Sequence, residues 1–254
     1  MAKSLYDLSG RVAIVTGGGT GIGKAIALEL ARAGADIILA SRNPAHLKGP
    51  AQQIRDMGRK CLEVMADVRQ PEQVDQMVKK TLDGMGRIDI LVNNAGGAFH
   101  SPAEKISPNG WNAVLAVNLT GTFLCCRAVF PAMAQQKEGV IVNVASISGR
   151  DGAPGKAHYG AAKAGVMNLT LSLASEWAKY GIRVNCLIPG PIETEGVKEA
   201  LKVEEVQDLA NVALGRWGQP EEVSRVVLYL VSKAAAFITG DLLNVDGGPR
   251  QRGG

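Results

Sequence analysis

The chain has 254 residues, of which 46% are hydrophobic and 20% are charged, and its formal net charge is +4. These values are typical of a globular protein, and the length suits a single α/β domain with a large core. The small basic excess contains no run of Lys or Arg, so we expect no nucleic-acid partner.

Cysteine usage and the N-terminus bear on the location of the protein. The cysteines are Cys61, Cys125, Cys126 and Cys186, and none forms a CxxC pair or joins a histidine at the spacing of a metal site. We therefore expect no metal ion, and we expect these thiols to be buried in a reducing compartment. Residues 1–10 carry no long apolar run, and no segment approaches the roughly 20 apolar residues that span a bilayer. The prediction is a cytoplasmic protein without membrane contact.

Strand and helix patterns alternate from end to end of the chain. In chain order they predict a strand at Val12–Thr16, a helix at Gly21–Ala33, a strand at Asp36–Ser41, a helix near 50–57, a strand at Cys61–Ala66, a helix near 71–84, a strand at Ile88–Asn93, a helix near 109–136, a strand at Gly139–Ala145, a helix near 157–179, a strand at Ile182–Ile188, a helix near 220–232 and a strand at Leu242–Val245. This alternation predicts an α/β fold, a Rossmann-type doubly wound parallel sheet of about seven strands. We expect one domain over residues 1–254, because no repeat or low-complexity linker interrupts the pattern.

The least regular region lies between residues 189 and 215. It contains Pro189, Gly190, Pro191 and Gly196, followed by an acidic stretch of helical character. It also follows the end of a predicted strand, where open α/β sheets bind their ligands, and long loops in such places are often lids. We therefore predict that the segment near 189–215 is a substrate cover.

A glycine-rich turn joins the first strand to the first helix. Residues 16–23 read TGGGTGIG. Glycines let the backbone approach a pyrophosphate, and the N-terminus of the following helix offers unpaired N–H groups and a favourable dipole. In this strand–turn–helix setting the pattern predicts a dinucleotide site rather than a simple tight turn. The residues expected at the cofactor are Gly17, Thr20, Gly21, Ile22 and Gly23.

The end of the second strand predicts the choice of nicotinamide cofactor. An acidic residue there would bind the ribose 2′-hydroxyl of NAD and repel the 2′-phosphate of NADP. The sequence instead places Ser41, Arg42 and Asn43 at this point, while Asp36 stands at the wrong end of the strand. Because Arg42 can neutralise a phosphate and Ser41 can donate a hydrogen bond, we expect NADP, with NAD as the less favoured choice.

Two later strand ends complete the predicted cofactor site. Asp67 and Val68 close the third strand. Asp67 is expected to accept a hydrogen bond from the adenine amino group and Val68 to pack on the ring, and the alternative for Asp67 is a place beside a helix N-cap. Asn94, Ala95 and Gly96 follow the fourth strand at the same edge of the sheet, where their small size leaves room for the cofactor.

Tyr159 and Lys163 carry the catalytic prediction. They stand four residues apart in a helical segment, so both lie on one face of the helix. A nearby ammonium favours the phenolate and lowers the pKa of a tyrosine from its usual value near 10, which suits it to proton exchange with an alcohol or carbonyl oxygen. Ser146 lies just after the fifth strand, Asn118 within the preceding long helix, and Thr194 beyond the sixth strand.

Together these motifs resemble the short-chain dehydrogenase/reductase family over residues 8–248. The matching segments are TGGGTGIG at 16–23, Asp67-Val68, NNAG at 93–96, Asn118, Ser146, YGAAK at 159–163, PGPIET at 189–194 and Asp246-Gly247-Gly248. The resemblance implies a nicotinamide-dependent oxidoreductase, in which the cofactor supplies the hydride and the protein supplies orientation and proton transfer.

The resemblance also implies a role for each catalytic residue. Tyr159 would be the general acid/base and Ser146 would hold the substrate oxygen. Lys163 would bind the nicotinamide ribose and lower the pKa of Tyr159, and Asn118 would hold a water that links Lys163 to solvent.

The segment after the sixth strand would complete the nicotinamide site. By the same resemblance, Pro189 and Gly190 would border the cofactor, and Ile192 and Thr194 would contact the nicotinamide amide.

The implied activity is the NADP(H)-dependent interconversion of a ketone and a secondary alcohol, on a small carbonyl compound or a 3-oxoacyl thioester. The segments 40–42 and 189–196 also resemble members that act on acyl-CoA, including enoyl- and dienoyl-CoA reductases, which reduce carbon–carbon double bonds. The dienoyl-CoA reductases lack the tyrosine that stands here at 159. A non-catalytic NADP-binding regulatory protein of the same fold is a further alternative, against which the complete Asn, Ser, Tyr and Lys set argues.

The family resemblance further implies a homotetramer. The helices near 109–136 and 157–179 would pack against their symmetry mates, and the segment 246–254 would make another contact.

Two histidines lie close to these motifs in the sequence. His158 precedes Tyr159 and therefore points roughly 100° away from it on a helix, so we expect it to have no chemical role. His100 follows the NNAG segment and is a candidate to line the substrate mouth.

Overall fold

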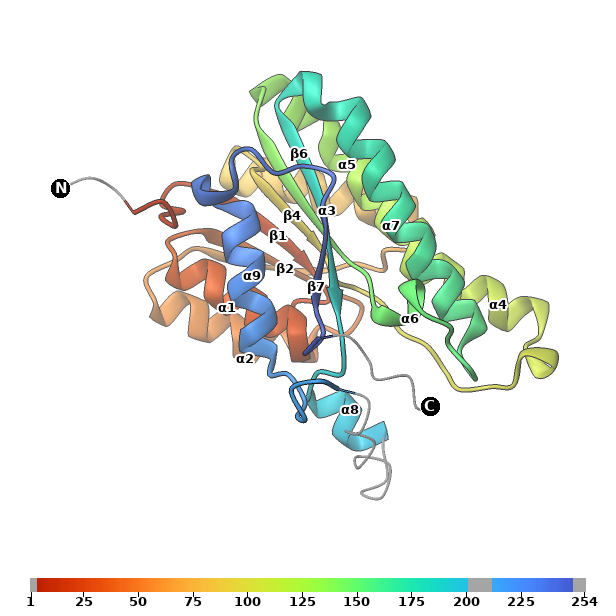
Figure 1. Ribbon diagram of the computed structural model, residues 1–254. Coiled ribbons are helices and arrows are strands. Elements are labelled where there is room, and N and C mark those ends of the chain that lie inside the picture. Colours follow the sequence, from red (N-terminus) through yellow and green to blue (C-terminus); the bar gives the residue numbers. More distant parts are fainter. Residues whose placement is uncertain (1–3, 201–211, 249–254) are drawn as a thin grey trace.

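The computed structural model describes residues 4–200 and 212–248 (Figure 1). Within them, a 7-stranded parallel sheet has the strand order β3-β2-β1-β4-β5-β6-β7. The strands are β1 (Val12–Thr16), β2 (Asp36–Ser41), β3 (Cys61–Met65), β4 (Ile90–Asn93), β5 (Gly139–Val144), β6 (Ile182–Pro189) and β7 (Leu242–Val245). The predicted doubly wound parallel sheet is confirmed.

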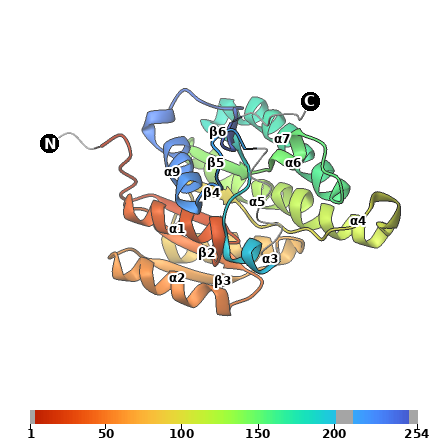
Figure 2. The same cartoon turned by 60° about the horizontal axis from the view of Figure 1, so that its bottom comes forward.

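Helices cover both faces of this sheet (Figures 1 and 2). One face carries α1 (Gly21–Arg32), α2 (Ala45–Asp56) and α9 (Pro220–Val231). The other carries α3 (Pro71–Met85), α5 (Gly121–Gln136) and α7 (Ala157–Trp177). Three shorter helices, α4 (Pro108–Leu115), α6 (Ile147–Arg150) and α8 (Glu195–Ala200), lie toward the carboxyl edge of the sheet, where they frame the site described below.

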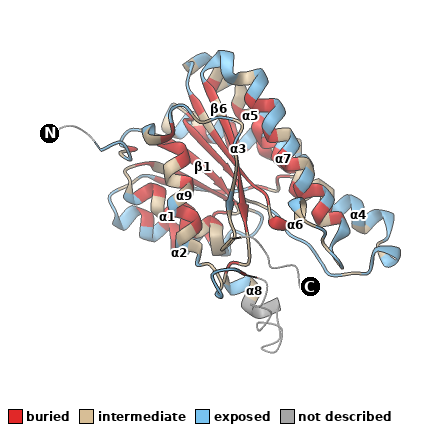
Figure 3. Ribbon diagram, in the orientation of Figure 1, coloured by how far each residue is buried: buried red, intermediate tan, exposed pale blue. Residues whose placement is uncertain are grey.

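The strands form the core because both of their faces are covered. All of β1 is buried, and alternate side chains point to opposite faces: Val15 and Leu39 pack under α1 and α2, while Ile14 and Ile38 pack under α3 and α5. Figure 3 shows burial concentrated in the strands and on the inward sides of the helices. Continuous apolar runs of this kind are typical of parallel strands with helices on both sides.

The carboxyl ends of β1 and β4 form the topological switch point. From β1 the chain winds outward through β2 and β3, and it then crosses back to add β4 on the other side of β1. Open α/β sheets bind their ligands in the crevice at such a point. The glycine-rich turn after β1 and the segment 94–96 after β4 both start there, so the topology brings two predicted cofactor segments side by side.

The helix predicted near 109–136 is interrupted at Asn118. A π-helical turn, η2 (Ala116–Thr120), separates α4 from α5. The Asn118 amide Nδ2 donates to Val114 O at 2.9 Å and to Gly97 O at 2.7 Å. The side chain therefore binds a backbone carbonyl of its own helix, and a widened turn of this kind often marks a functional site.

Other boundaries also differ from the prediction. α2 begins at Ala45 rather than near residue 50; its N-cap is Pro44, and Asn43 Oδ1, one residue earlier, accepts from Ala45 N at 3.0 Å. α6 was not predicted; it starts after Ser146, whose Oγ accepts from Ser148 N at 3.2 Å. Of the predicted substrate cover, residues 201–211 lie outside the described residues.

The helical run Pro108–Gln136 corrects one expectation from the sequence. It has 29 residues, with a mean hydropathy of 1.7 in its most apolar window, and is therefore long and apolar enough to cross a membrane by length and composition. Its side chains Cys125, Cys126, Val129 and Met133 are fully buried against the sheet. The core helix of a globular protein meets the same criteria, and this packing fits that role.

A buried carboxylate binds the amino ends of two neighbouring strands together. Asp89 is 2% exposed and accepts from Arg11 Nη1 at 2.8 Å, from Arg87 Nε at 2.7 Å and from Val12 N at 2.9 Å. Arg11 also donates to both oxygens of Glu138 at 2.7 Å. Burial raises the pKa of Asp89, but the bonds from Arg87 and Arg11 outweigh it, so the pKa is lowered and the carboxylate stays charged.

We expect Asp89→Asn to lower the free energy of unfolding by about 2–3 kcal/mol at neutral pH, since two arginines keep their charges and lose a partner. The folded pKa of Asp89 lies below its unfolded value of 3.8, so this stabilisation is present above that value and is lost as the pH falls through the folded pKa. Urea unfolding of both proteins at decreasing pH measures it. If the difference in the free energy of unfolding between the two proteins stayed constant down to about pH 2, the assignment would be contradicted.

Candidate active site

The glycine-rich turn is built for a close backbone approach. Gly17 has a φ of 64° and Gly21 a φ of 50°, a conformation that favours glycine. A Cβ on Gly23 would collide with Gly17 O and lie 2.5 Å from Asn94 Nδ2. Thr20, the N-cap of α1, makes no side-chain capping bond, and the first turn of α1 holds no acidic residue. Gly17 N and Gly18 N donate to Ala40 O, whereas the N–H groups at the start of α1 are available to a phosphate, so the turn fits a dinucleotide.

The segment after β4 is bound to this turn. Thr16 Oγ1 accepts from the backbone N–H groups of Asn94 and Ala95, both at 3.1 Å. The Asn94 Nδ2 donates back to Thr16 O at 3.2 Å and to Gly17 O at 3.3 Å. Asn94 thus holds the segment after β4 against the glycine-rich turn and fixes the shape of the predicted cofactor crevice.

The three residues predicted to face the adenosine ribose have different surroundings. Ser41 Oγ accepts from Asn43 N at 3.2 Å, and Asn43 Oδ1 accepts from Ala45 N at 3.0 Å, just before α2. Arg42 is exposed and makes no hydrogen bond to the described residues. Its charge contributes to lowering the pKa of Asp67, which places Arg42 near the end of β3. Arg42 is therefore the group of the three that remains available to a ligand phosphate.

Asp67 has a partner that the sequence analysis missed. Arg69 donates to it twice, from Nε to Oδ1 at 2.9 Å and from Nη2 to Oδ2 at 2.5 Å, and this pairing lowers the pKa of Asp67. The sequence signal that could have predicted this pair is the position of Arg69, a positively charged residue two positions after Asp67. Val68 is buried, and a Cβ on Gly121 would lie 2.6 Å from its Cγ2, so its side chain packs against α5. The adenine contacts of Asp67 and Val68 stay predictions.

Asn118, Lys163 and Gly96 meet beneath the crevice. Asn118 and Lys163 are buried, with 0% and 4% of their surfaces exposed. The Lys163 Nζ donates to Val144 O at 2.8 Å, at the end of β5. A Cβ on Gly96 would lie 2.5 Å from Asn118 Oδ1 and 3.5 Å from Lys163 Nζ. The structure thus brings two members of the predicted catalytic set against a predicted cofactor residue.

Tyr159 and Ser146 form the other half of the catalytic set. Their side chains lie close together, and the Lys163 Nζ lies 5.6 Å from the centre of the Tyr159 ring. Burial raises the pKa of Tyr159, and the neighbouring Ser146 side chain offsets part of that rise. The expected lowering of this pKa by Lys163 is therefore wrong for the protein alone, because desolvation of the ring outweighs a cation at this distance.

Lys163 is an ammonium group in a largely apolar setting. Burial lowers its pKa to about 8, and the neighbouring Cys186 partly opposes that change. Cys186 is itself buried, which raises its pKa to about 11. Lys163 therefore stays mostly charged at neutral pH, and its pKa is sensitive to any charged group placed beside it.

The PGPIET segment reaches the site in part. Gly190 N donates to Val245 O at 2.9 Å, which joins the segment to β7. A Cβ on Gly21 would lie 3.3 Å from Thr194 Cγ2, so Thr194 lies against the glycine-rich turn, and its contact with the nicotinamide amide stays a prediction. The side chain of Ile192 is instead buried in the core under α9. Only its backbone could then contact the nicotinamide amide, and this contact stays a prediction.

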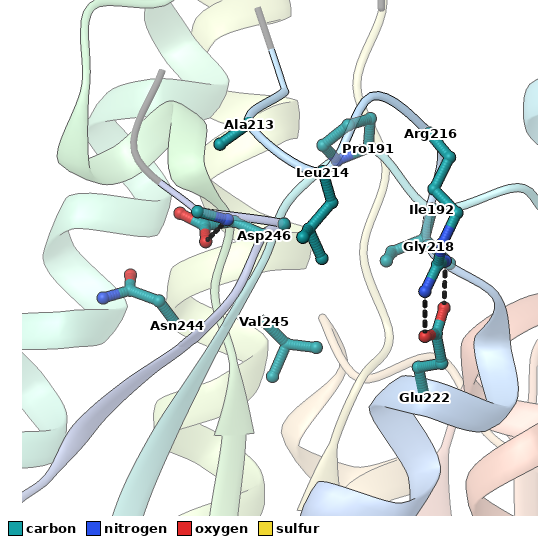
Figure 4. A pocket seen from close by; sticks show the side chains of 12 residues that line it. Pro191, Ile192, Ala213, Leu214, Arg216, Gly218, Glu222, Asn244, Val245 and Asp246 are labelled. Atoms are coloured by element: carbon teal, nitrogen blue, oxygen red, sulfur yellow. Dashed lines mark hydrogen bonds and ion pairs between the residues drawn. The ribbon is translucent and has the colours of Figure 1, made fainter. Parts of the chain in front are cut away.

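A pocket of about 510 Å³ lies beside this segment (Figure 4). An ion pair between Arg216 and Glu222 borders it. It is lined by Pro191, Ile192, Ala213, Leu214, Arg216, Gly218, Glu222, Asn244, Val245, Asp246, Gly247 and Gly248. None of the four catalytic candidates contributes to it. Among the residues the structure describes, no group of His, Cys, Asp and Glu side chains could hold a metal ion.

Comparison with known proteins identifies the family. Residues 17–249 match the family model described as enoyl-(acyl carrier protein) reductase. A 3-oxoacyl-[acyl-carrier-protein] reductase of Synechocystis is 42% identical over 95% of this chain and 97% of its own length. A probable 2,4-dienoyl-CoA reductase of Bacillus subtilis is 40% identical over 94% of this chain and 96% of its own. A 7α-hydroxysteroid dehydrogenase solved with NADH and a 7-oxo bile acid has a TM-score of 0.94 at 29% identity and covers 99% of each chain.

The chain belongs to the short-chain dehydrogenase/reductase family, as its motifs predicted. It is an oxidoreductase of that family, and its relatives imply the use of a nicotinamide cofactor.

Neighbouring glycines offer a matched test of the crevice floor. Gly96→Ala would push against Asn118 and Lys163, whereas a Cβ on Gly97 meets nothing within 4 Å. We expect Gly96→Ala to lower turnover by about 100-fold or more, because it displaces groups that must be placed to within fractions of an ångström. Gly97→Ala should stay within about threefold of the wild type. Steady-state rates and melting temperatures measure both, and equal activity in the two variants would contradict this packing.

Proposed function

We propose that this protein is an NADPH-dependent reductase that converts the ketone of a 3-oxoacyl thioester to a secondary alcohol, and catalyses the reverse oxidation. The observation that carries the proposal is the closeness of the Tyr159 and Ser146 side chains, with the buried ammonium of Lys163 beside them. Two hydroxyl groups side by side suit an oxygen atom on which charge develops. The name of the Synechocystis relative supports the thioester class.

The residues divide the work of such a reaction. The bound nicotinamide would supply or accept the hydride. Ser146 would donate a hydrogen bond to the carbonyl oxygen, and Tyr159 would transfer its proton to that oxygen as negative charge builds there. Lys163, charged at neutral pH, would bind the cofactor ribose and stabilise the phenolate left on Tyr159. Asn118, against Gly96 and Gly97, would hold the turn that lets water reach Lys163.

The part of the site predicted to hold the adenosine ribose fits NADPH better than NADH. Arg42 is exposed there without a hydrogen bond to the described residues, and no acidic residue ends β2. Because Asp67 is paired with Arg69, its charge is already neutralised and does not repel a phosphate. NAD is the competing choice, because the 7α-hydroxysteroid dehydrogenase that is similar in fold was solved with NADH.

The second candidate function is the reduction of a carbon–carbon double bond in an enoyl or dienoyl thioester. The Bacillus subtilis relative and the description of the family model favour it. That reaction delivers its proton to a carbon atom, whereas Tyr159 and Ser146 converge as oxygen-directed donors. The carbonyl reaction therefore makes better use of this site.

We also propose a homotetramer and a cytoplasmic location. Phe123 on α5 and Leu171 on α7 are each 42% exposed, as expected of helices that pack against symmetry mates. The predicted contact of residues 249–254 lies outside the described residues. All four cysteines are free and buried, which fits a reducing compartment.

Arg42→Ala tests the cofactor choice. Losing a charge-assisted contact to the 2′-phosphate should weaken NADPH binding by roughly 1.5–3 kcal/mol, with little change for NADH. Fluorescence titration of the purified variant with each cofactor measures both affinities. Equal losses for the two cofactors would remove Arg42 from the phosphate site.

Tyr159→Phe tests the proposed reaction. With a 3-oxoacyl thioester and NADPH, kcat should fall by about 100-fold or more, the usual scale for a lost general acid. The fold and the affinity for NADPH should be retained, because the ring remains and only its hydroxyl is removed. Near-normal turnover in this variant would show that another group donates the proton and would favour the double-bond reaction.

A further inference from the structure

Phe99 lies between α4 and the start of the catalytic helix α7. Its ring meets the His158 ring at an interplanar angle of 85°, with 4.5 Å between the ring centres. On its other side, a Cβ on Gly110 would lie 2.9 Å from Phe99 Cζ, so glycine is needed there. Phe99 is still 44% exposed, and part of its ring therefore faces solvent.

His158, the residue before Tyr159, is completely buried, with 0% exposed. Its Nδ1 accepts from the backbone N–H of Tyr159 at 2.9 Å, which assigns the proton of the neutral ring to Nε2. This Nε2 is buried and has no hydrogen-bond partner among the described residues. Such a donor costs about 1–3 kcal/mol, so packing must hold the ring in place, and Phe99 is the aromatic ring packed against it.

A second contact joins the same two parts of the chain. The His100 ring lies against Gly155, where a Cβ would collide with it, and Ser101 N donates to Gly155 O at 2.9 Å. Gly155 stands directly before α7, whose N-cap residue Lys156 makes no side-chain capping bond. The first turn of α7 is therefore held by the segment 97–102 instead of by its own cap.

We propose that Phe99 is a positioning residue, which places the Tyr159 hydroxyl for proton transfer through its contact with His158. The inference rests on the proposed carbonyl chemistry at Tyr159. The path is short, since Phe99 packs on His158 and His158 binds the N–H of Tyr159 itself. An error of about 1 Å in such a group can cost on the order of 100-fold in rate. Since part of Phe99 is exposed, a substrate that touches it also acts on the placement of the proton donor.

The experiment compares Phe99→Ala with Phe99→Tyr, which keeps the ring. Tyr180→Ala is the matched control: Tyr180 is 37% exposed, and its ring meets Phe130 at 87° with 5.2 Å between centres, just beyond the far end of α7. With acetoacetyl-CoA and NADPH, Phe99→Ala should lower kcat by about 10-fold or more, while the Kd of NADPH stays within about twofold. Phe99→Tyr and Tyr180→Ala should keep kcat within about threefold of the wild type.

A second measurement needs no substrate. Hydrogen exchange of the backbone amides of residues 158–161 should be about 10-fold faster in Phe99→Ala than in the wild type, and unchanged in Tyr180→Ala. Unchanged exchange in Phe99→Ala, or an unchanged kcat in an otherwise active enzyme, overturns the proposal. Should the wild type reduce no 3-oxoacyl thioester, the proposed function fails, and faster exchange in Phe99→Ala alone would still support the positioning contact.

Discussion

The candidate active site depends on an ammonium group held inside the protein with no carboxylate of the described residues paired to it. Among the described residues, the hydrogen bond of the buried Lys163 goes to a neutral oxygen, Val144 O at 2.8 Å. A buried charge is costly, and the lowering of the Lys163 pKa to about 8 expresses that cost. A carboxylate partner would relieve it but would also cancel the net positive charge that a neighbouring phenolate needs. The chemistry proposed for Tyr159 requires the positive charge of Lys163, which explains why this charge is present despite the free-energy cost of burying it.

Glycines make the close packing around this ammonium possible. A Cβ on Gly149 would lie 2.6 Å from the backbone of Lys163, and one on Gly160 would lie 2.7 Å from Ser148 O. α6, which presents Ser146, therefore lies directly on α7, which presents Tyr159 and Lys163. Gly96 allows the same approach from the β4 side. The predicted catalytic residues can therefore approach one another closely, because glycines leave no side chain between the elements that carry them.

The sequence predicted those parts of the structure that depend on local patterns. Apolar runs bounded by Gly or polar residues predicted the positions of β1, β2 and β7, whose bounds match the prediction. The catalytic set emerged from motif spacing, and the structure brings Asn118 to Lys163 and Ser146 to Tyr159.

The remaining features depend on contacts between distant residues or on competition between groups. The π-helical turn lies at Asn118, whose amide binds the carbonyl of Gly97 in another segment, a contact that local spacing does not reveal. The pKa of Tyr159 is set by how deeply the ring is buried, which spacing does not reveal. The contact between His158 and Phe99, on which the positioning proposal rests, also joins distant segments and cannot be read from the sequence.

The central claim is that hydride reaches a carbonyl carbon while Tyr159 protonates the oxygen. The most direct measurement offers the purified enzyme a 3-oxoacyl-CoA, a 2-enoyl-CoA and a 2,4-dienoyl-CoA together with NADPH, and identifies the products by NMR. The account predicts that the 3-hydroxyacyl thioester accumulates while both unsaturated substrates persist. Loss of a double bond with the ketone left intact would contradict it.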